Sequence, residues 1–295
     1  MREMSHREKV AMNIPHDSKT GTLYIVATPI GNLEDMTFRA VRILKEVSLI
    51  AAEDTRRTKM LLQTYNIRNP VTSLYDQNEK RKSGLIIAKL QGGQDVAYVS
   101  DAGTPGISDP GYLLVRRAVE HNIPVVPVPG VSAVIAALSV SGLPMDAFVF
   151  YGFLPSRAGK RKTFLQSLRD EEKTLVFYES PRRLIRSLGE MECVFGNREV
   201  VVLREMTKVF EEIIRGTIPQ VMSMLQGKEV RGEVTLVMAG RKKKATEYSD
   251  EEIRNRFEAL RQKTDLSRRD MIDRLALAMG VSRKRVYGIV NIQFS

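Results

Sequence analysis

Residues 96–121 read VAYVSDAGTPGISDPGYLLVRRAVEH, a short apolar run followed by a turn and a helical pattern. The run Val96–Ser100 has the length of a buried strand, and Tyr112–His121 repeats apolar residues at helical spacing. The turn between them, Ser100–Gly111, is rich in glycine, proline and aspartate and has no lysine or arginine. Glycine-rich turns after a strand usually bind phosphate. This turn therefore predicts a ligand site in an α/β fold, for a ligand that is not an anion such as phosphate.

The rest of the N-terminal half repeats this alternation of strand and helix. Apolar runs at Leu23–Thr28, Leu49–Asp54 and 124–128 are separated by helical patterns such as Thr37–Val47 and Ser132–Ser141. Short apolar strands that alternate with helices predict parallel βαβ units, with helices on both faces of the sheet. Two further strands, at residues 23–28 and 124–128, also end in turns of glycine and proline. Ligands bind at the edge where such parallel strands end.

Changes in composition divide the chain into four parts. Residues 1–20 predict a flexible tail, and residues 21–151 predict an N-terminal parallel α/β domain. The stretch 152–162, GFLPSRAGKRK, reads as a hinge. The strand-like and helical runs of residues 152–240 predict a second α/β domain with a mixed sheet. Residues 241–295 predict a basic helical extension.

The extension carries the signals of three short helices. Ser249 with Glu252 and Ser267 with Asp270 form capping boxes, Gly280 ends the second helix, and Ser282 can cap the third. Two helices carry apolar stripes, one of Ile253, Phe257 and Leu260 and one of Met271, Leu275 and Ala278. The last two helices resemble a helix-turn-helix. Basic residues gather at the start of the last helix, at Arg283, Lys284 and Arg285. The extension is either a nucleic-acid-binding appendage or a solvated tail that packs on a neighbour.

The composition of the 295-residue chain is that of a globular protein with a net charge of +11. A positive surplus of this size favours a polyanionic partner such as nucleic acid. Cys193 is the one cysteine, so the chain has no internal disulfide. We find no cluster with metal-ligand spacing, no signal peptide and no apolar run long enough to span a membrane, and we expect a cytoplasmic protein.

Motifs of the common nucleotide sites are absent. The chain has no GxxxxGK[ST] and no GxGxxG after its first strand. Asp101 and Asp109 would repel a triphosphate, whereas the sulfonium and amino groups of S-adenosylmethionine are cations. Both aspartates can instead be turn formers that bond their own backbone. We expect that role for Asp109 and take Asp101 as the carboxylate that faces the cofactor.

Several long motifs resemble a known family. They are LYIVATPIGNLEDMTFRAVRILKEVSLIAAEDTRRT (23–58), VSDAGTPGISDPGY (99–112), PVPGVSAVIAALSVSGLP (127–144), GFLP (152–155), FYESPRRL (177–184) and REMTKVFEE (204–212). In this order they are similar to the bacterial 16S rRNA cytidine ribose-2′-O-methyltransferases of the tetrapyrrole methylase superfamily. The match covers about residues 21–240, and the basic extension also resembles that group more weakly.

The resemblance implies a two-domain, class III methyltransferase fold with S-adenosylmethionine in the cleft between the domains, in a homodimer. It also implies methylation of the ribose of cytidine 1402 at the decoding site of 16S rRNA, within the small ribosomal subunit. The cofactor-binding residues that it implies, with the neighbouring turn residues, are Pro29, Ser100, Asp101, Ala102, Gly103, Thr104, Ile107, Ser132, Ala133 and Tyr178.

A ribose hydroxyl is a poor nucleophile, so the reaction needs a proton acceptor. The candidates are Glu53, Asp54, Glu179, Glu205 and Lys208. Glu53 and Asp54 can equally cap the following helix. The candidates for rRNA phosphate contacts are Arg56, Arg57, Arg157, Lys160, Arg161, Arg182, Arg183, Arg283, Lys284 and Arg285. Two other functions stay open: a tetrapyrrole or small-molecule methyltransferase, and a non-enzymatic RNA-binding assembly factor.

Overall fold

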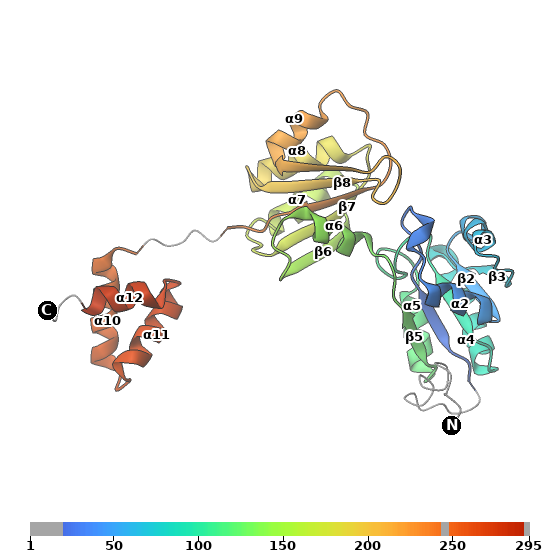
Figure 1. Ribbon diagram of the computed structural model, residues 1–295, viewed down its shortest axis with the longest axis horizontal. Coiled ribbons are helices and arrows are strands. Elements are labelled where there is room, and N and C mark those ends of the chain that lie inside the picture. Colours follow the sequence, from blue (N-terminus) through green and yellow to red (C-terminus); the bar gives the residue numbers. More distant parts are fainter. Residues whose placement is uncertain (1–19, 243–247, 292–295) are drawn as a thin grey trace. The chain divides into compact units, whose positions relative to one another are not determined.

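The computed structural model describes residues 20–242 and 248–291, and the chain forms two compact units, residues 1–241 and 242–295. Figure 1 shows two β-sheets in the first unit and helices in the second. The predicted tail lies, except for Thr20, outside the described residues. Within the described ranges, no helix has the length and apolarity needed to cross a membrane.

The first sheet has five parallel strands in the order β3-β2-β4-β1-β5. The strands are β1 (Leu23–Val26), β2 (Leu49–Ala52), β3 (Val71–Ser73), β4 (Val96–Val99) and β5 (Val125–Val128). The helices between them are the 3-10 helix η1 (Leu33–Asp35), α2 (Phe38–Glu46), α3 (Thr55–Thr64), α4 (Asp76–Gln91) and α5 (Tyr112–Glu120). The predicted parallel α/β arrangement is confirmed.

Both faces of this sheet are buried, because successive side chains of a strand point to opposite sides. Ile50 packs into one apolar cluster with Val26, whereas the next residue, Ala51, packs into the opposite cluster with Leu23 and Tyr98. Helices cover each face, so the inner strands β2 and β4 have apolar residues on both faces rather than in alternation. The polar ligand groups must therefore come from the strand ends.

The second sheet is mixed, in the order β6-β7-β10-β8-β9. Strands β6 and β7 are parallel, and the remaining pairs are antiparallel, as predicted. The strands are β6 (Phe148–Phe153), β7 (Thr174–Glu179), β8 (Glu199–Arg204), β9 (Glu212–Thr217) and β10 (Val234–Met238). The helices are α6 (Ala133–Ser141), α7 (Ala158–Ser167), α8 (Leu184–Phe195) and α9 (Ile218–Leu225).

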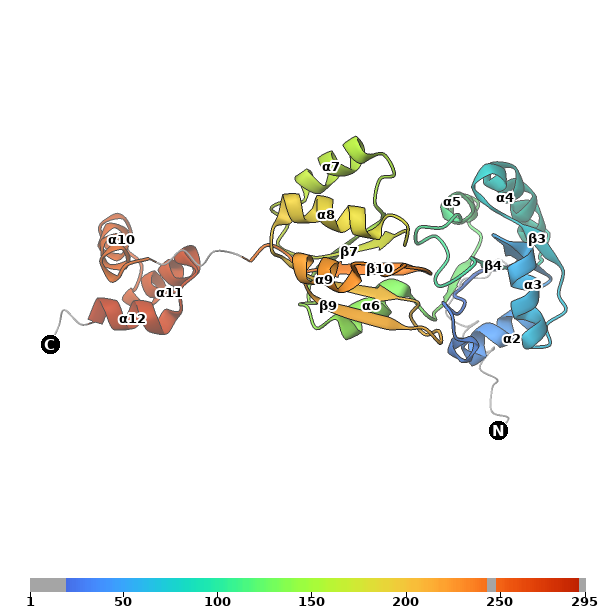
Figure 2. The same ribbon diagram turned by 90° about the horizontal axis from the view of Figure 1, so that it is seen from above.

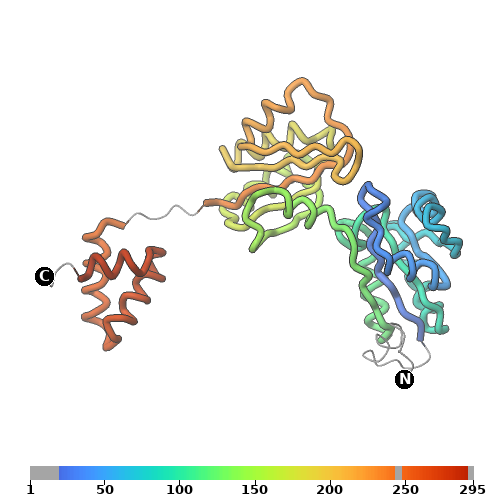
Figure 3. The backbone as a smooth tube through the Cα atoms, viewed as in Figure 1, coloured from blue at the N-terminus to red at the C-terminus, as the bar shows by residue number. Residues whose placement is uncertain are grey.

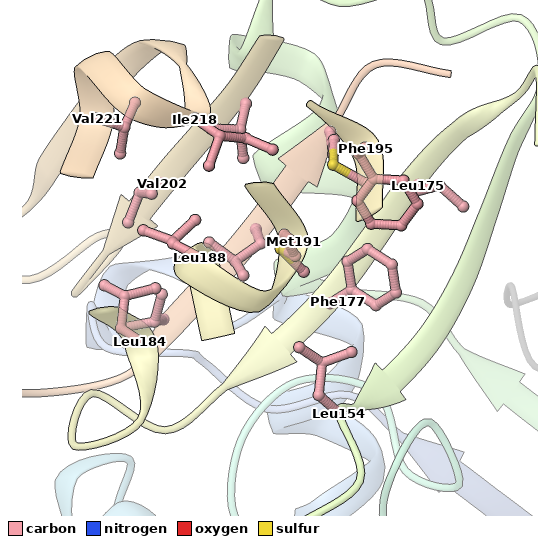
Figure 4. Packing of buried hydrophobic residues seen from close by; sticks show 14 of the residues in the cluster. Leu154, Leu175, Phe177, Leu184, Leu188, Met191, Phe195, Val202, Ile218 and Val221 are labelled. Atoms are coloured by element: carbon pink, nitrogen blue, oxygen red, sulfur yellow. The ribbon is translucent and has the colours of Figure 1, made fainter. Parts of the chain in front are cut away.

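This sheet has its own core. Figure 4 shows the side chains of Leu188 and Met191 from α8 against Phe177 from β7, and Ile218 from α9 lies in the same cluster. On the opposite face, α6 packs against β7, β8 and β10. Burying one side chain of this size stabilises the fold by about 1.5–3 kcal/mol. Each sheet therefore has a hydrophobic core of its own.

The predicted boundary between the two α/β domains, at residues 151 and 152, is wrong. Strand β6 hydrogen-bonds to β7, and Val134 of α6 packs on the second sheet. The chain therefore leaves the first sheet after Val128, as the trace in Figure 3 shows. The periodicity of an apolar run predicts a strand but does not say which sheet it joins.

The predicted hinge at 152–162 contains the start of a helix. Helix α7 begins at Ala158 and packs beside α8, where Figure 2 shows the two together. Its Leu165 is fully buried, and so is Arg161. Glycine and repeated cations hid this helix, because they are typical of loops.

The second unit consists of α10 (Asp250–Lys263), α11 (Arg268–Met279) and α12 (Arg283–Asn291). The predicted caps at Ser249, Ser267 and Ser282 are confirmed, and Gly280 ends α11 in the left-handed conformation. The second predicted stripe is partly wrong. Ala278 is exposed, and Met271 and Leu275 are instead buried with the residues next to them, so that face of α11 is wider than the stripe.

Candidate functional site

The three predicted turns meet at the end of the first sheet. Thr28 and Gly103 exchange backbone hydrogen bonds of 2.9 Å in both directions, so the turn after β4 is pinned to the end of β1. The hydroxyl of Thr104 donates to the carbonyl of Val131, in the turn after β5, at 3.2 Å. Gly103 has φ +78°, a conformation that glycine adopts without strain. The turns thus form one rigid edge.

The start of α5 is occupied by a carboxylate of the protein itself. Glu79 Oε1, on α4, accepts hydrogen bonds from the amides of Gly111, Leu113 and Leu114 at 3.0, 3.0 and 3.3 Å. Gly111 has φ +123°, and a Cβ there would overlap the ring of Tyr98. The first amides of a helix are the usual anion site after a glycine turn. Here a side chain satisfies them.

A cavity of about 370 Å³ opens beside this edge. It is lined by residues of both sheets, namely Ile30, Ala102, Gly103, Thr104, Ile107, Ser108, Asp109, Ser132, Ala133, Phe153, Tyr178, Glu179, Ser180, Pro181, Met206, Gly232, Glu233, Val234 and Thr235. Its described lining holds three acidic residues and no lysine or arginine. The described residues include no group of three His, Cys, Asp or Glu side chains arranged for a metal ion.

Seven of the ten predicted cofactor residues line this cavity. They are Ala102, Gly103, Thr104, Ile107, Ser132, Ala133 and Tyr178. The other three, Pro29, Ser100 and Asp101, line a neighbouring groove instead. The sequence missed the contribution of β10 and its preceding loop, residues 232–235, because the run 232–240 predicts a strand and nothing in it points to a ligand.

The two aspartates of the turn have exchanged their expected places. Asp101 accepts from the amide of Asp54 at 3.0 Å and pairs with Arg57 at 3.2 Å, so it joins the ends of two strands. Asp109 lines the cavity, and burial and then the charges of Asp101 and Asp76 raise its pKa, against a hydrogen bond from Ser100. Asp109 therefore lines the cavity and Asp101 the neighbouring groove, the reverse of the predicted arrangement.

Tyr178 also lines the cavity. Burial, followed by the charges of Asp109 and Glu233, raises the pKa of its hydroxyl to about 12. Its ring packs edge-on against Phe150 with centroids 4.9 Å apart, and lies 5.5 Å from that of Phe153. Tyr178 thus stays protonated and forms an aromatic wall with Phe153.

Glu179 lines the cavity but its carboxylate is already bound. It accepts from the hydroxyl of Ser187 at 2.5 Å and pairs with Arg183 at 2.6 Å. The side chain of Glu179 is fully buried. A carboxylate held in this way is a structural group, and the prediction that it accepts a proton from substrate does not fit it.

The candidates Glu53 and Asp54 lie outside the cavity lining. Asp54 caps α3, since its Oδ1 accepts from the amide of Arg56 at 2.8 Å. Its pKa is lowered by the hydrogen bonds from Arg56. The pKa of Glu53 is raised, first by burial and then by the charges of Asp109 and Asp101. The capping alternative thus holds for Asp54.

Glu205 and Lys208 form an ionic group in the loop after β8. Lys208 Nζ lies 2.9 Å from Glu205 and 3.2 Å from Glu233. Burial lowers the pKa of Lys208, but the hydrogen bond that it donates to Glu205 and the charge of Glu233 outweigh burial and raise the pKa. The hydrogen bond to Lys208 lowers the pKa of Glu205. Lys208 is therefore a cation at neutral pH, which does not fit a proton acceptor.

The backbone of this loop is unusual. Glu205 and Thr207 have positive φ angles of 51° and 66°. The amide of Asn32, in the first sheet's domain, donates to Thr207 Oγ1 at 3.0 Å. A Cβ on Gly31 would overlap the side chain of Lys208. Uncommon backbone angles of non-glycine residues concentrate at functional sites.

A groove of about 320 Å³ adjoins the cavity. It is lined by Pro29, Ile30, Gly31, Leu33, Arg57, Thr58, Met60, Leu61, Thr64, Ser100, Asp101, Ala102, Lys208 and Glu233. Ile30, Ala102 and Glu233 line both hollows. The cavity and the groove therefore share three wall residues.

The predicted RNA-binding cations divide by exposure. Arg56, Arg57, Arg157, Lys160 and Arg182 are exposed, whereas Arg183 is half-buried in its pair with Glu179. Arg161 is 1% exposed, and its guanidinium binds Glu190 at 2.6 and 2.7 Å. The prediction that Arg161 contacts RNA is wrong, because its charge is buried and compensated inside α7 and α8.

The cations of α12 also divide. Arg283 pairs with Asp273 at 2.6 Å, and Arg285 bonds the carbonyl of Tyr248 at 2.8 Å and lies 3.3 Å from Asp250. Lys284 is exposed and has no ion-pair partner among the described residues. Two of the three cations thus tie the helices of the second unit together.

The chain matches the family model of tetrapyrrole (corrin/porphyrin) methylases over residues 22–222. It is 49% identical over 223 residues to the ribosomal RNA small subunit methyltransferase I of Pseudomonas aeruginosa, covering 75% of this chain and 79% of that one. The protein of that name from Synechocystis is 45% identical over 269 residues, covering 90% and 96%.

A solved structure has a similar fold. The uroporphyrin-III C-methyltransferase of Thermus thermophilus, complexed with S-adenosyl homocysteine, aligns with a TM-score of 0.53 and 19% identity. The alignment covers 74% of this chain and 97% of that one. At this identity the likeness establishes the fold.

Proposed function

Because the chain belongs to the tetrapyrrole methylase family, we propose that it is an S-adenosylmethionine-dependent methyltransferase that acts on the RNA of the small ribosomal subunit. The two relatives are both named ribosomal RNA small subunit methyltransferase I, and the alignments cover 79% and 96% of their lengths. The related solved structure contains S-adenosyl homocysteine.

The charge of the cavity is the observation that carries the proposal. Among the described residues that line the cavity there is no lysine or arginine; Asp109 has no ion-pair partner among the described residues, and Glu233 pairs with Lys208 of the neighbouring groove. Such a site favours a ligand with positive centres, as S-adenosylmethionine has, over a phosphate. Glu79 blocks the helix amides that would hold a phosphate. Phe153 and Tyr178 add an aromatic wall suited to a nucleobase.

The residues that would hold the cofactor follow from the lining. Ala102, Gly103 and Thr104 present backbone groups from the pinned turn, and Ser132 and Ala133 begin α6. When bound, S-adenosylmethionine supplies a methyl group on a positively charged sulfur. The protein's contribution is to fix the acceptor within reach and in line, which accounts for much of the rate in such reactions.

The finer proposal is transfer to the ribose 2′ oxygen of cytidine 1402 in 16S rRNA. It is supported by the motifs shared with that group of enzymes, by the net charge of +11 and by the exposed cations near the groove. A tetrapyrrole substrate is the alternative that the fold itself leaves open.

The experiment uses the full chain with S-adenosylmethionine labelled in the methyl group. Small ribosomal subunits that lack the methyl group and uroporphyrinogen are offered as acceptors in parallel. We expect label in 16S rRNA and resistance of one phosphodiester to alkali, because a 2′-O-methyl group blocks that cleavage. Label in uroporphyrinogen alone, or in neither acceptor, would overturn the proposal. Calorimetry with S-adenosylmethionine and ATP separately tests the cofactor.

A further inference from the structure

The groove beside the cavity has properties that the cofactor does not need. It contains two cations, Arg57 and Lys208, each held by carboxylates. Between them lie apolar side chains, of which Met60 is 64% and Leu33 is 45% exposed. Exposed apolar surface flanked by fixed cations matches a nucleotide, whose base is apolar on its faces and whose phosphate is an anion.

The acids around the two hollows differ in their freedom to accept a proton. Asp101 is bound to Arg57 and to a backbone amide, and Glu179 is bound to Arg183 and Ser187. Among the described residues, the carboxylate of Glu233 pairs with Lys208 alone, at 3.2 Å, and the side chain is 69% exposed. Among the described residues that line either hollow, it is the one carboxylate that lines both.

From this arrangement, and resting on the proposed function, we infer that the groove binds the acceptor nucleotide and that Glu233 is the catalytic base. Glu233 takes the proton of the ribose hydroxyl as the oxygen–methyl bond forms; the sulfur–methyl bond breaks, its electron pair stays on sulfur, and the proton then passes to solvent. Lys208 is a positioning residue, which holds Glu233 at the border of the two hollows. Glu205 in turn anchors Lys208.

The small residue at position 31 is part of this arrangement. The side chain of Lys208 crosses the backbone of Gly31, where a Cβ would overlap it. The amide of the next residue, Asn32, bonds Thr207. These contacts join the wall contributed by the first sheet to the wall contributed by the loop after β8. The groove therefore exists only while both walls are in contact.

Occupation of the groove is tested without reference to activity. In a Cys193→Ser background, which removes the exposed native thiol, Met60→Cys places a reporter in the groove. Leu85→Cys, at an exposed position of α4 that lines neither hollow, is the matched control. We expect unmethylated small subunits to slow alkylation of the thiol at position 60 at least about tenfold and that at position 85 less than about twofold, followed by mass spectrometry.

The catalytic role is tested with Glu233→Gln, and Glu229→Gln, an exposed acid of the same loop paired with Arg231, is its control. Removing a general base costs about 10²–10⁴-fold in single-turnover rate. We expect that loss for Glu233→Gln at saturating cofactor and subunits, with the acidic limb of the rate–pH profile abolished. Glu229→Gln should keep the rate and the profile.

Each negative outcome has a distinct meaning. Equal alkylation at position 60 with and without subunits, or equal protection at both positions, would contradict binding of the acceptor nucleotide in the groove. A Glu233→Gln enzyme with the original rate and the original acidic limb would show that Glu233 is not the catalytic base. If the unmodified chain fails to methylate subunits at all, the proposed function itself fails, and this is seen before any variant is made.

Discussion

Glu79, in the first turn of α4, accepts the amide of Gly111 at the start of α5 with a hydrogen bond of 3.0 Å. The same oxygen binds two further amides of that turn. The glycine-rich turn therefore has the shape of a phosphate loop without its function, since a carboxylate of the protein already occupies the place of the anion. This explains why the turn contains no lysine or arginine.

Glu79→Ala should lower the free energy of unfolding by about 2 kcal/mol, because it leaves partly buried amides without acceptors. Urea denaturation measures it. Glu120→Ala is the control, since Glu120 makes an exposed pair with Arg116 and its loss should change the free energy of unfolding little. Equal losses in the two variants would show that Glu79 does not cap α5.

Asp109→Asn should weaken the binding of S-adenosylmethionine about 10- to 100-fold, the cost of a lost charge-assisted hydrogen bond. Calorimetry measures it, and Asp101→Asn is the comparison, because Asp101 faces Arg57 outside the cavity. A larger loss of cofactor affinity in Asp101→Asn than in Asp109→Asn would restore the expectation drawn from the sequence.

The variant Asp109→Asn should be more stable than the unmodified chain at neutral pH. The carboxyl of Asp109 has a pKa raised above the unfolded value of 3.8, so between the two values the folded state binds more protons. Its stability therefore falls as pH rises through the folded pKa. The gain from Asp109→Asn should shrink towards zero as the pH approaches 3.8, which urea midpoints at several pH values would reveal. A gain that is constant with pH would contradict this.

Arg161→Met should cost about 1–3 kcal/mol of stability and leave the affinity of the folded enzyme for small subunits within about twofold. The variant removes a buried guanidinium that bonds Glu190 and the carbonyls of Pro155 and Ser156, while the half-buried Glu190 keeps Arg186 as a partner. Arg157→Glu and Lys160→Glu change exposed positions of the same segment. They should weaken subunit binding and leave the stability nearly unchanged. Filter binding and urea denaturation of the three variants separate the two roles.

Lys284→Glu should reduce subunit affinity and lower the slope of log affinity against log salt by about one, as expected for one phosphate contact. The thermal stability of the second unit should stay unchanged, because Lys284 has no ionic partner among the described residues. Arg283→Glu should also destabilise the unit, since it places a carboxylate against Asp273. Unchanged affinity in Lys284→Glu would exclude this face of α12 as an RNA contact.

The sequence predicts the local structure well, because strands, helices and caps depend on neighbouring residues. The helix start at Ser249 follows from a four-residue motif, and the mixed second sheet follows from adjacent strand-like runs. The assignment of β6 to the second sheet does not follow, because pairing depends on residues far along the chain. Helix α7 was missed because Gly159 and its cations resemble a loop.

The site follows the same division. The turn at Gly103 is visible in the sequence, since glycine and proline after a strand are local signals. The orientation of Asp101 and Asp109 is not, because it depends on Arg57 and the end of a different strand. Glu233 carries no signal of its own. It gains significance only through Lys208, which approaches it from another loop.

The hollows are built between two sheets that each possess a separate hydrophobic core. Mild denaturant can therefore break the contacts of Gly31 and Asn32 with the loop after β8 while every strand stays paired. Methyltransferase activity should then be lost at a lower denaturant concentration than the circular dichroism signal. A titration followed by ellipticity alone would overestimate the range of denaturant concentrations in which this enzyme works.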